Sequence, residues 1–164
     1  MNTTELKLRF YPDNILRKKA SLVRSVDNEI KDILKQMSEI MYEHKGVGLA
    51  ANQVGLNISL LVADPGDHLY KLVNPKIIYK EGNEVMEEGC LSLPNLCVKI
   101  KRAKKIIVKA LDEKGNSITM EADNLLSRIL QHEIDHLNGK LIIDYLPLFK
   151  RILVKRKLKR LKAI

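Results

Sequence analysis

Residues 123–139 read DNLLSRILQHEIDHLNG and have the pattern of a buried helix. Asp123 can cap a helix that runs from Asn124 to Asn138, and Gly139 can end it. Apolar side chains cover most of the circumference of this helix, at Leu125, Leu126, Ile129, Leu130, Ile134 and Leu137. A helix that is apolar over most of its surface is usually buried, so we expect it inside the domain.

Two histidines lie on one face of this expected helix. His132 and His136 are four residues apart, which is about one turn, so both rings can reach one metal ion. Glu133 flanks that face and can contact a water on the ion without being a ligand. The same pattern also occurs by chance on solvent-exposed helices. Burial argues against chance here, because a buried histidine or glutamate needs a partner, and a metal site would supply one.

The third metal ligand does not follow the two histidines. A metzincin protease would have its third histidine where this chain has Ile142. Thermolysin-like enzymes take an acidic ligand from a later helix, but Asp144 is the only acid after His136 and lies too close in sequence. The third ligand therefore comes from upstream, or the site binds no metal.

Two upstream segments are candidates for the rest of such a site. In EGCLS, residues 88–92, the Cys90 thiolate would suit Zn²⁺ or Fe²⁺, although a lone cysteine is more often a small buried apolar residue. We expect that ordinary core role for Cys97. In GVGLAANQ, residues 46–53, small side chains would let a substrate backbone pass closely and Gln53 offers an amide donor. A tight turn after a helix is the simpler interpretation of that segment.

The remaining pattern indicates an α+β fold in a single domain. A helix is expected at residues 28–43, capped by Asp27 or Asn28, and a basic helix at about residues 147–163. Mostly antiparallel strands would surround the buried helix. They are expected at residues 57–63, 69–73, 76–80, 84–90, 97–101, 105–112 and 117–121. The whole chain, 1–164, would form this domain, with a catalytic body at about residues 11–145.

The composition indicates in which compartment the protein works and what kind of partner it binds. No apolar run is long enough to span a bilayer, the first ten residues lack the apolar block of a secretory signal, and two cysteines make no disulfide framework. We therefore expect a cytoplasmic protein. The net charge is +9, and residues 150–162 hold eight Lys or Arg and no acid. That charge favours an anionic partner such as nucleic acid, ribosome or acidic membrane.

Taken together, three motifs resemble those of peptide deformylases, in the family's order. They are GVGLAANQ at 46–53, EGCLS at 88–92 and QHEIDHLNG at 131–139. YPDNILR at 11–17 is similar to the family's start, although Asn14 replaces a frequent proline. The resemblance runs from about Tyr11 to Tyr145.

The resemblance implies a hydrolase that removes the formyl group from the N-terminal formylmethionine of nascent polypeptides, in bacterial or organelle-type translation. Cys90, His132 and His136 would bind one divalent metal ion, Fe²⁺ or Zn²⁺, with Ni²⁺ or Co²⁺ as substitutes. Glu133 would move a proton from the attacking water to the leaving amine. The Gln53 side chain and the Leu91 backbone N–H would stabilise the oxyanion.

The resemblance also implies substrate contacts. The backbones of Val47, Gly48 and Gly89 would hold an extended peptide, and Met86, Leu125, Ile129 and the His132 ring would form the methionine pocket. Glu88 and Asp135 would orient the metal ligands, with Arg102 as a partner of one of them, or these residues would form simple surface ion pairs.

The basic tail has three interpretations. As in some family members, Arg151, Lys155, Arg156, Lys159 and Arg160 would contact the ribosome through phosphates. Alternatively, Ile152, Leu153, Leu158 and Leu161 would pack the helix onto the domain, or the helix would bind a membrane surface.

Two rival functions remain open on sequence. One is a metallopeptidase that cuts internal peptide bonds, with a wider cleft. The other is a basic ribosome- or RNA-binding module with a structural metal, for which Cys97, His44 or His68 would supply a fourth ligand.

Overall fold

Antiparallel strands form two sheets in this protein, whose computed structural model describes residues 6–161. A five-stranded sheet has the order β1-β2-β3-β6-β7, and a two-stranded sheet pairs β4 with β5. The strands are β1 (Gly48–Ala50), β2 (Leu60–Ala63), β3 (Tyr70–Glu81), β4 (Glu84–Cys90), β5 (Leu93–Arg102), β6 (Lys105–Leu111) and β7 (Ser117–Asp123).

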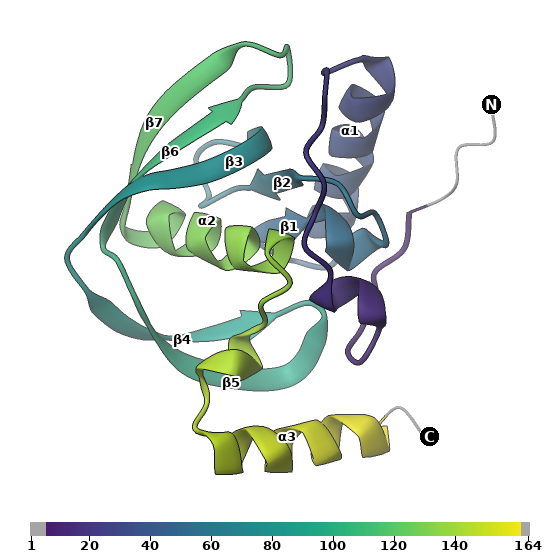
Figure 1. Ribbon diagram of the computed structural model, residues 1–164, viewed down its shortest axis with the longest axis vertical. Coiled ribbons are helices and arrows are strands. Elements are labelled where there is room, and N and C mark those ends of the chain that lie inside the picture. Colours follow the sequence, from purple (N-terminus) through teal and green to yellow (C-terminus); the bar gives the residue numbers. More distant parts are fainter. Residues whose placement is uncertain (1–5, 162–164) are drawn as a thin grey trace.

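Helix α2 (Asn124–Leu137) lies between the two sheets (Figure 1). Its apolar side chains Ile129, Leu130 and Ile134 pack in one cluster with residues of the five-stranded sheet. The expected α+β fold around a buried helix is therefore confirmed. The expected cap is only partly right, because Asp123 occupies the N-cap position but its side chain makes no capping hydrogen bond.

Gly139 ends α2 for two physical reasons. Its φ of +72° lies in the left-handed region, which favours glycine. A Cβ at this position would also lie 2.4 Å from the carbonyl oxygen of Arg17, at the end of the short 3-10 helix η1 (Asn14–Arg17). Residue 139 can therefore pack this closely against η1 only if it has no side chain.

Helix α1 (Asn28–Glu43) packs on β1 and β2, on the face of the sheet opposite to the one that α2 covers (Figure 1). The Asp27 carboxylate accepts a hydrogen bond from the Ile30 N–H at 3.0 Å, as expected of a cap. Leu34, Met37 and Met41 are fully buried in a second cluster with β1 and β2. This helix is confirmed at the predicted bounds.

Several strand bounds differ from the prediction. The two short strands expected around Pro75 are one strand, β3, whose register shifts between Val73 and Lys76. Pro75 has no N–H to donate to a neighbouring strand, and the shift in register accommodates it. The strand continues through the proline because it pairs with β2 before Pro75 and with β6 on both sides of it. β2 begins at Leu60 rather than at residue 57. β1 and the 3-10 helix η2 (Ala51–Val54) replace most of the expected turn at 46–53.

Cys97 is not a core residue. β5 begins at Leu93, four residues before the predicted start, and its inward side chains include Val98 and Ile100. Side chains alternate along a strand, so Cys97 points to solvent.

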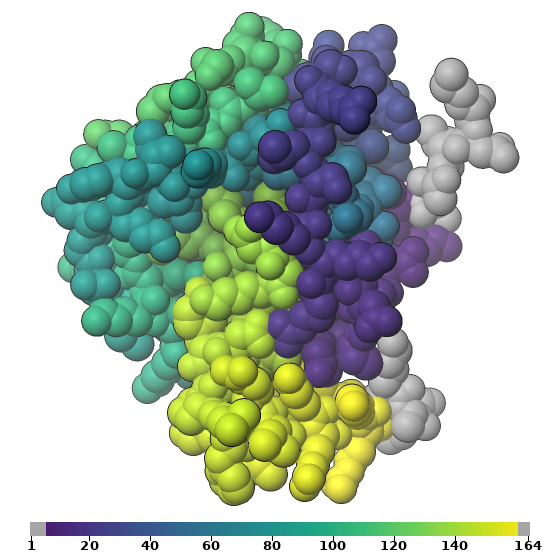
Figure 2. Space-filling model, in the orientation of Figure 1, coloured from purple at the N-terminus to yellow at the C-terminus, as the bar shows by residue number. Residues whose placement is uncertain are grey.

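The chain ends, within the described residues, in the 3-10 helix η3 (Ile142–Tyr145) and helix α3 (Leu148–Leu161). α3 lies on the surface, at the bottom of Figure 2. Val154 and Leu158 pack against a third cluster, whereas Ile152 and Leu153 are 43% and 48% exposed. The packing role considered for Ile152 and Leu153 is therefore wrong. The side chain of Leu161 and the predicted helix end at residue 163 lie outside what is described.

No helix among residues 6–161 is long and apolar enough to cross a membrane.

Candidate metal and active site

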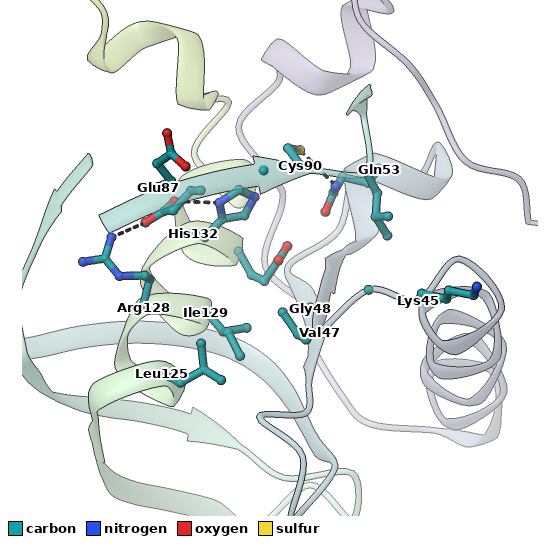
Figure 3. A pocket seen from close by; sticks show the side chains of 15 residues that line it. Lys45, Val47, Gly48, Gln53, Glu87, Cys90, Leu125, Arg128, Ile129 and His132 are labelled. Atoms are coloured by element: carbon teal, nitrogen blue, oxygen red, sulfur yellow. Dashed lines mark hydrogen bonds and ion pairs between the residues drawn. The ribbon is translucent and has the colours of Figure 1, made fainter. Parts of the chain in front are cut away.

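A cavity of about 380 Å³ opens between the segment leading into β1, the end of β4 and one face of α2. The three predicted motifs meet there. Figure 3 shows Cys90, Gln53 and His132 at one end of the cavity and Leu125 and Ile129 towards the other. The lining residues are Lys45, Gly46, Val47, Gly48, Gln53, Glu87, Glu88, Gly89, Cys90, Leu91, Leu125, Arg128, Ile129, His132 and Glu133.

Three metal-binding atoms converge at the end of this cavity where Cys90 and His132 lie. The Nε2 of His136 lies 3.2 Å from the Sγ of Cys90 and 3.2 Å from the Nε2 of His132. The ligand atoms of all three residues lie within 4.8 Å of one another. β4 supplies the cysteine and α2 the two histidines, so residues more than forty positions apart in sequence share one site.

The donor set fits a divalent metal ion. The Nδ1 of His132 lies 3.0 Å from a carboxylate oxygen of Glu88, which places the ring proton on Nδ1 and leaves the Nε2 lone pair for a metal. Thiolate and imidazole are the usual ligands of Zn²⁺ and Fe²⁺. Among the described residues, neither Cys97, His44 nor His68 joins the group. Three protein ligands beside a cavity are typical of a catalytic rather than a structural metal site.

Glu88 is held by two arginines as well as by His132. Its carboxylate accepts hydrogen bonds at 2.9 Å from Nε and at 2.9 Å from Nη2 of Arg102, and at 2.7 Å from Nη1 of Arg128. Arg102 also donates to Asp135 at 2.6 Å. Burial alone would raise the pKa of Glu88, but the hydrogen bonds from Arg102 and His132 outweigh it and lower the pKa to about 2. Glu88 is therefore a buried, ionised partner of a metal-binding histidine.

These contacts rule out surface ion pairs for Glu88 and Arg102, and they show that Arg128 belongs to the site. Glu88 and Arg102 are buried, so the interpretation of simple surface ion pairs is wrong for them. Arg128 was not singled out from the sequence. It lies four residues before His132 on α2, and this spacing on one helix face could have indicated it.

Gln53 is oriented towards the cysteine by a hydrogen bond from the backbone of Ala50. Its side-chain oxygen accepts a hydrogen bond from the Ala50 N–H at 2.9 Å. The amide nitrogen therefore faces the Ser92 hydroxyl, at 3.2 Å, and the Sγ of Cys90, at 3.7 Å. Next to it on η2, Asn52 donates a hydrogen bond to the His136 carbonyl, a contact that the sequence did not predict.

Glu133 is buried beside the donor atoms, with 3% of its surface exposed. Its Oε2 has no hydrogen-bond partner among the described residues. Burial disfavours the charged carboxylate and raises the pKa of Glu133 to about 7, against the opposing effect of His132. Gly48 makes room for it, because a Cβ there would lie 2.5 Å from Oε1. This carboxyl group is suited to accepting and releasing a proton near neutral pH.

The two histidines differ in their protonation. Burial opposes the charged form of His132, but its contacts with Cys90 and Glu88 raise its pKa well above the usual value. Burial and the nearby charge of His132 lower the pKa of His136 well below the usual value. Of the two rings, His136 is neutral and His132 is protonated and paired with anions. A metal ion that binds to both rings would displace the extra proton of His132.

The comparison with known proteins identifies the family. The sequence model of polypeptide deformylases matches residues 6–151.

The chain belongs to the polypeptide deformylase family.

Individual relatives support this assignment over nearly the whole length. A peptide deformylase of Pseudoalteromonas translucida is 45% identical over 163 residues, which cover 98% of this chain and 96% of the relative. The crystal structure of a peptide deformylase from Legionella pneumophila is 40% identical, with a TM-score of 0.89, and the match covers 96% of this chain and 95% of that one. The peptide deformylase from Ehrlichia chaffeensis in complex with actinonin has a TM-score of 0.91 at 37% identity, covering 97% and 98%.

Members of this deformylase family are metal-dependent hydrolases that remove the formyl group from nascent polypeptides, and this chain has that function. It therefore takes part in N-terminal methionine processing during protein biosynthesis. Its Cys90, His132 and His136 form a group able to hold the metal.

Most residues expected to contact the substrate line the deformylase cavity. Val47, Gly48, Gly89, Leu125 and Ile129 all do so. Met86 does not line it within the described part of the chain; its side chain is exposed on β4. Met86 shares a face of β4 with Glu88, which does line the cavity, but it lies two residues farther from Cys90 along the strand.

Proposed function

We propose that Cys90, His132 and His136 bind one Fe²⁺ or Zn²⁺ ion, and that the surrounding cavity deformylates the N-terminal formylmethionine of nascent polypeptides. The observation that carries the proposal is the convergence of three ligand atoms beside the buried, unpaired carboxyl oxygen of Glu133. A sulfur and two nitrogens suit both ions, and Ni²⁺ or Co²⁺ would be substitutes. When bound, such an ion would polarise the formyl carbonyl and lower the pKa of the attacking water.

Glu133 would serve as the general base and then the general acid. It would accept a proton from the water as the water attacks the formyl carbon. It would then donate this proton to the amine as the C–N bond breaks. The raised pKa of Glu133, about 7, supports this role, since such a group gains and loses a proton readily near neutral pH.

Gln53 and Leu91 would stabilise the negative charge that develops on the formyl oxygen. The Gln53 amide nitrogen is directed towards Cys90 by the hydrogen bond from Ala50 to its oxygen. The Leu91 N–H has no acceptor among the described residues, so it is available to a substrate. Removing one such donor typically costs about 2.7–4 kcal/mol of transition-state stabilisation.

The substrate backbone would lie between two strand edges. β1 is an edge strand of the five-stranded sheet, and β4 has only β5 as a neighbour. Val47 and Gly48 on one side and Gly89 on the other line the cavity, and unpaired strand edges bind extended peptides through backbone hydrogen bonds. Leu125 and Ile129, on one face of α2, would contact the methionine side chain.

Helix α3 would contact the ribosome, and the protein would act in the cytoplasm. The described part of α3 contains seven Lys or Arg residues and no acid, and Arg156, Lys157, Lys159 and Arg160 are exposed. Such a surface can neutralise RNA phosphates. Because Val154 and Leu158 pack against the body, we propose that α3 belongs to the same single domain as the catalytic residues.

The test uses the purified, metal-loaded full chain with formyl-Met-Ala-Ser and measures the release of free amine. We expect deformylation, its loss in Glu133→Ala, and no cleavage of an acetylated peptide or of an internal peptide bond. A protein that holds metal in full yet releases no formate with either Fe²⁺ under anaerobic conditions or Zn²⁺ would contradict the proposal. Cleavage of the internal bond would favour a metallopeptidase instead.

A further inference from the structure

A second cavity, of about 500 Å³, lies outside the deformylase site and shares no lining residue with it. It is bordered by the β3–β4 turn, the β5–β6 turn, α2 and the segment that follows α2. Its lining consists of Lys80, Gly82, Asn83, Lys101, Arg102, Ala103, Gln131, Lys140 and Tyr145. Four of these residues are cationic, and none of them is an acid.

The lysines around this cavity are not neutralised by the protein. Within residues 6–161, Lys80, Lys101 and Lys140 form no ion pair with a carboxylate. Lys140 instead lies over the ring of Tyr145, with its Nζ 3.9 Å from the ring centroid. Other lysines on the same sheets are paired, as Lys105 is with Glu121 at 2.9 Å. Like charges that face one cavity repel each other, and an anion between them would remove that repulsion.

Arg102 adds a buried guanidinium to the lining, although its charge is already paired with Glu88 and Asp135. Arg102 is 5% exposed and lines the cavity. A guanidinium has five N–H groups. Arg102 donates four hydrogen bonds: two to Glu88, one to Asp135 and one to Tyr145. One N–H of this buried group therefore has no acceptor within the described chain, and the carboxylates hold its plane in place.

We propose that this cavity binds a small molecule carrying a phosphate group. Phosphate offers several oxygens with more than one negative charge, which matches cations on more than one wall better than a single carboxylate does. The volume is in the range of small-molecule sites and larger than one phosphate needs, so an organic phosphate fits. A strand of nucleic acid is the competing source of the same group.

The test is a titration of the metal-loaded full chain with inorganic phosphate at constant ionic strength, followed by amide NMR signals. We expect saturable shifts at Gly82, Ala103 and Lys140. The variant Lys80→Gln/Lys101→Gln should raise the dissociation constant at least about tenfold, since each lost charged hydrogen bond weakens binding. The matched control Lys31→Gln/Lys35→Gln removes the same charge from α1, away from the cavity, and should leave the constant unchanged.

Both lysines of the variant are on the surface, so Arg102 and the residues that orient His132 stay intact, and thermal unfolding checks the fold of each protein. The parent titration stands even if a variant is unstable. The proposal would be overturned by the absence of saturable shifts around the cavity in the millimolar range, by equal weakening in the control variant, or by shifts confined to the residues around Cys90. A uridine oligonucleotide that displaces phosphate and shifts α3 as well would also overturn it, in favour of a nucleic-acid surface.

Discussion

The carboxyl group of Glu133 lies against Gly48 and lines the cavity together with His132, with only 3% of the residue exposed. Its surroundings, more than its residue type, give it a pKa of about 7. A glutamate on the surface would be ionised far below neutral pH and would hold a proton too weakly to donate it to an amine. At the scale of single residues, burial therefore prepares the proposed proton transfer.

Replacing this carboxyl group should abolish most of the activity and leave the metal bound. We expect Glu133→Gln to lower kcat by about 10²–10⁴-fold, the usual contribution of a general acid–base group. In the parent, kcat/KM should rise with pH until Glu133 is ionised, with the acidic limb ending at or below about pH 7, because a nearby cation can only lower that pKa. Steady-state rates across pH and metal analysis of both proteins check this. An unchanged acidic limb in the residual activity of Glu133→Gln would contradict the assignment.

Glu88 is the residue whose loss should affect both stability and metal binding. Glu88→Gln removes the charge that pairs with buried Arg102 and Arg128 and that fixes the His132 ring. Breaking a buried pair costs about 3–5 kcal/mol, and losing the partner of a metal-binding histidine weakens metal affinity about 10–100-fold. Urea denaturation and chelator competition measure the two effects. The neighbouring, exposed Glu87→Gln is the control, and equal effects in both variants would show that Glu88 has no special role.

At the scale of elements, α2 depends on how it ends. Gly139 lets the chain leave the helix beside the carbonyl oxygen of Arg17, where a Cβ would lie at 2.4 Å. Helix α2 holds two metal ligands, so a shift of its last turn would move His136. The packing of η1 against this turn thus connects the N-terminal segment to the site.

Gly139→Ala should be more destabilising than an alanine placed at a similar backbone angle. Gly115 has φ +87°, and the nearest atom to a Cβ added there would lie at 3.5 Å, an ordinary contact, so Gly115→Ala should cost only backbone strain, about 1–3 kcal/mol. Gly139→Ala adds a clash with backbone and should lower the free energy of unfolding by clearly more, with weaker metal binding. Chemical denaturation of the two variants gives the comparison, and equal losses would mean that the close approach to Arg17 carries no cost.

At the scale of the whole molecule, Arg17 and Asp144 join the N-terminal segment to the chain after α2. The guanidinium contacts the carboxylate at 2.5 Å and 3.1 Å. Partial burial would raise the pKa of Asp144, but the hydrogen bond from Arg17 outweighs it and lowers the pKa. The pair therefore holds η1 against η3, two segments that lie far apart in the sequence.

The contribution of this pair should depend on pH. A carboxylate whose pKa is lower in the folded protein adds stability above its unfolded value of 3.8, and that stability is lost as pH falls through the folded pKa. Arg17→Met should therefore lower the free energy of unfolding by about 1 kcal/mol at pH 7, a moderate figure because the pair is partly exposed. The difference from the parent should shrink below pH 3.8. Urea denaturation at several pH values tests this, with Lys35→Gln, which loses an exposed pair at 4.0 Å, as a control expected to change little.

The sequence alone determined the parts that depend on local periodicity. The apolar positions of residues 124–138 predicted a buried helix, and the spacing of His132 and His136 placed both rings on one face. The resemblance of three motifs added Cys90, Gln53 and Leu91, because their order along the chain is preserved even though nothing local indicates that they meet. The tail at about residues 147–163 was likewise expected to be a basic helix, and α3 spans Leu148–Leu161.

Only the tertiary structure decided which distant residues touch. The burial of Glu88 between Arg102 and Arg128 depends on α2 lying against the two-stranded sheet, and no local pattern encodes that contact. Pairing on both sides of β3 carries the strand through Pro75, which taken locally ends a strand. The register of β5 turns Cys97 outwards. Local sequence sets which faces of an element are apolar, whereas the long-range packing of those faces against each other sets which polar groups become buried together.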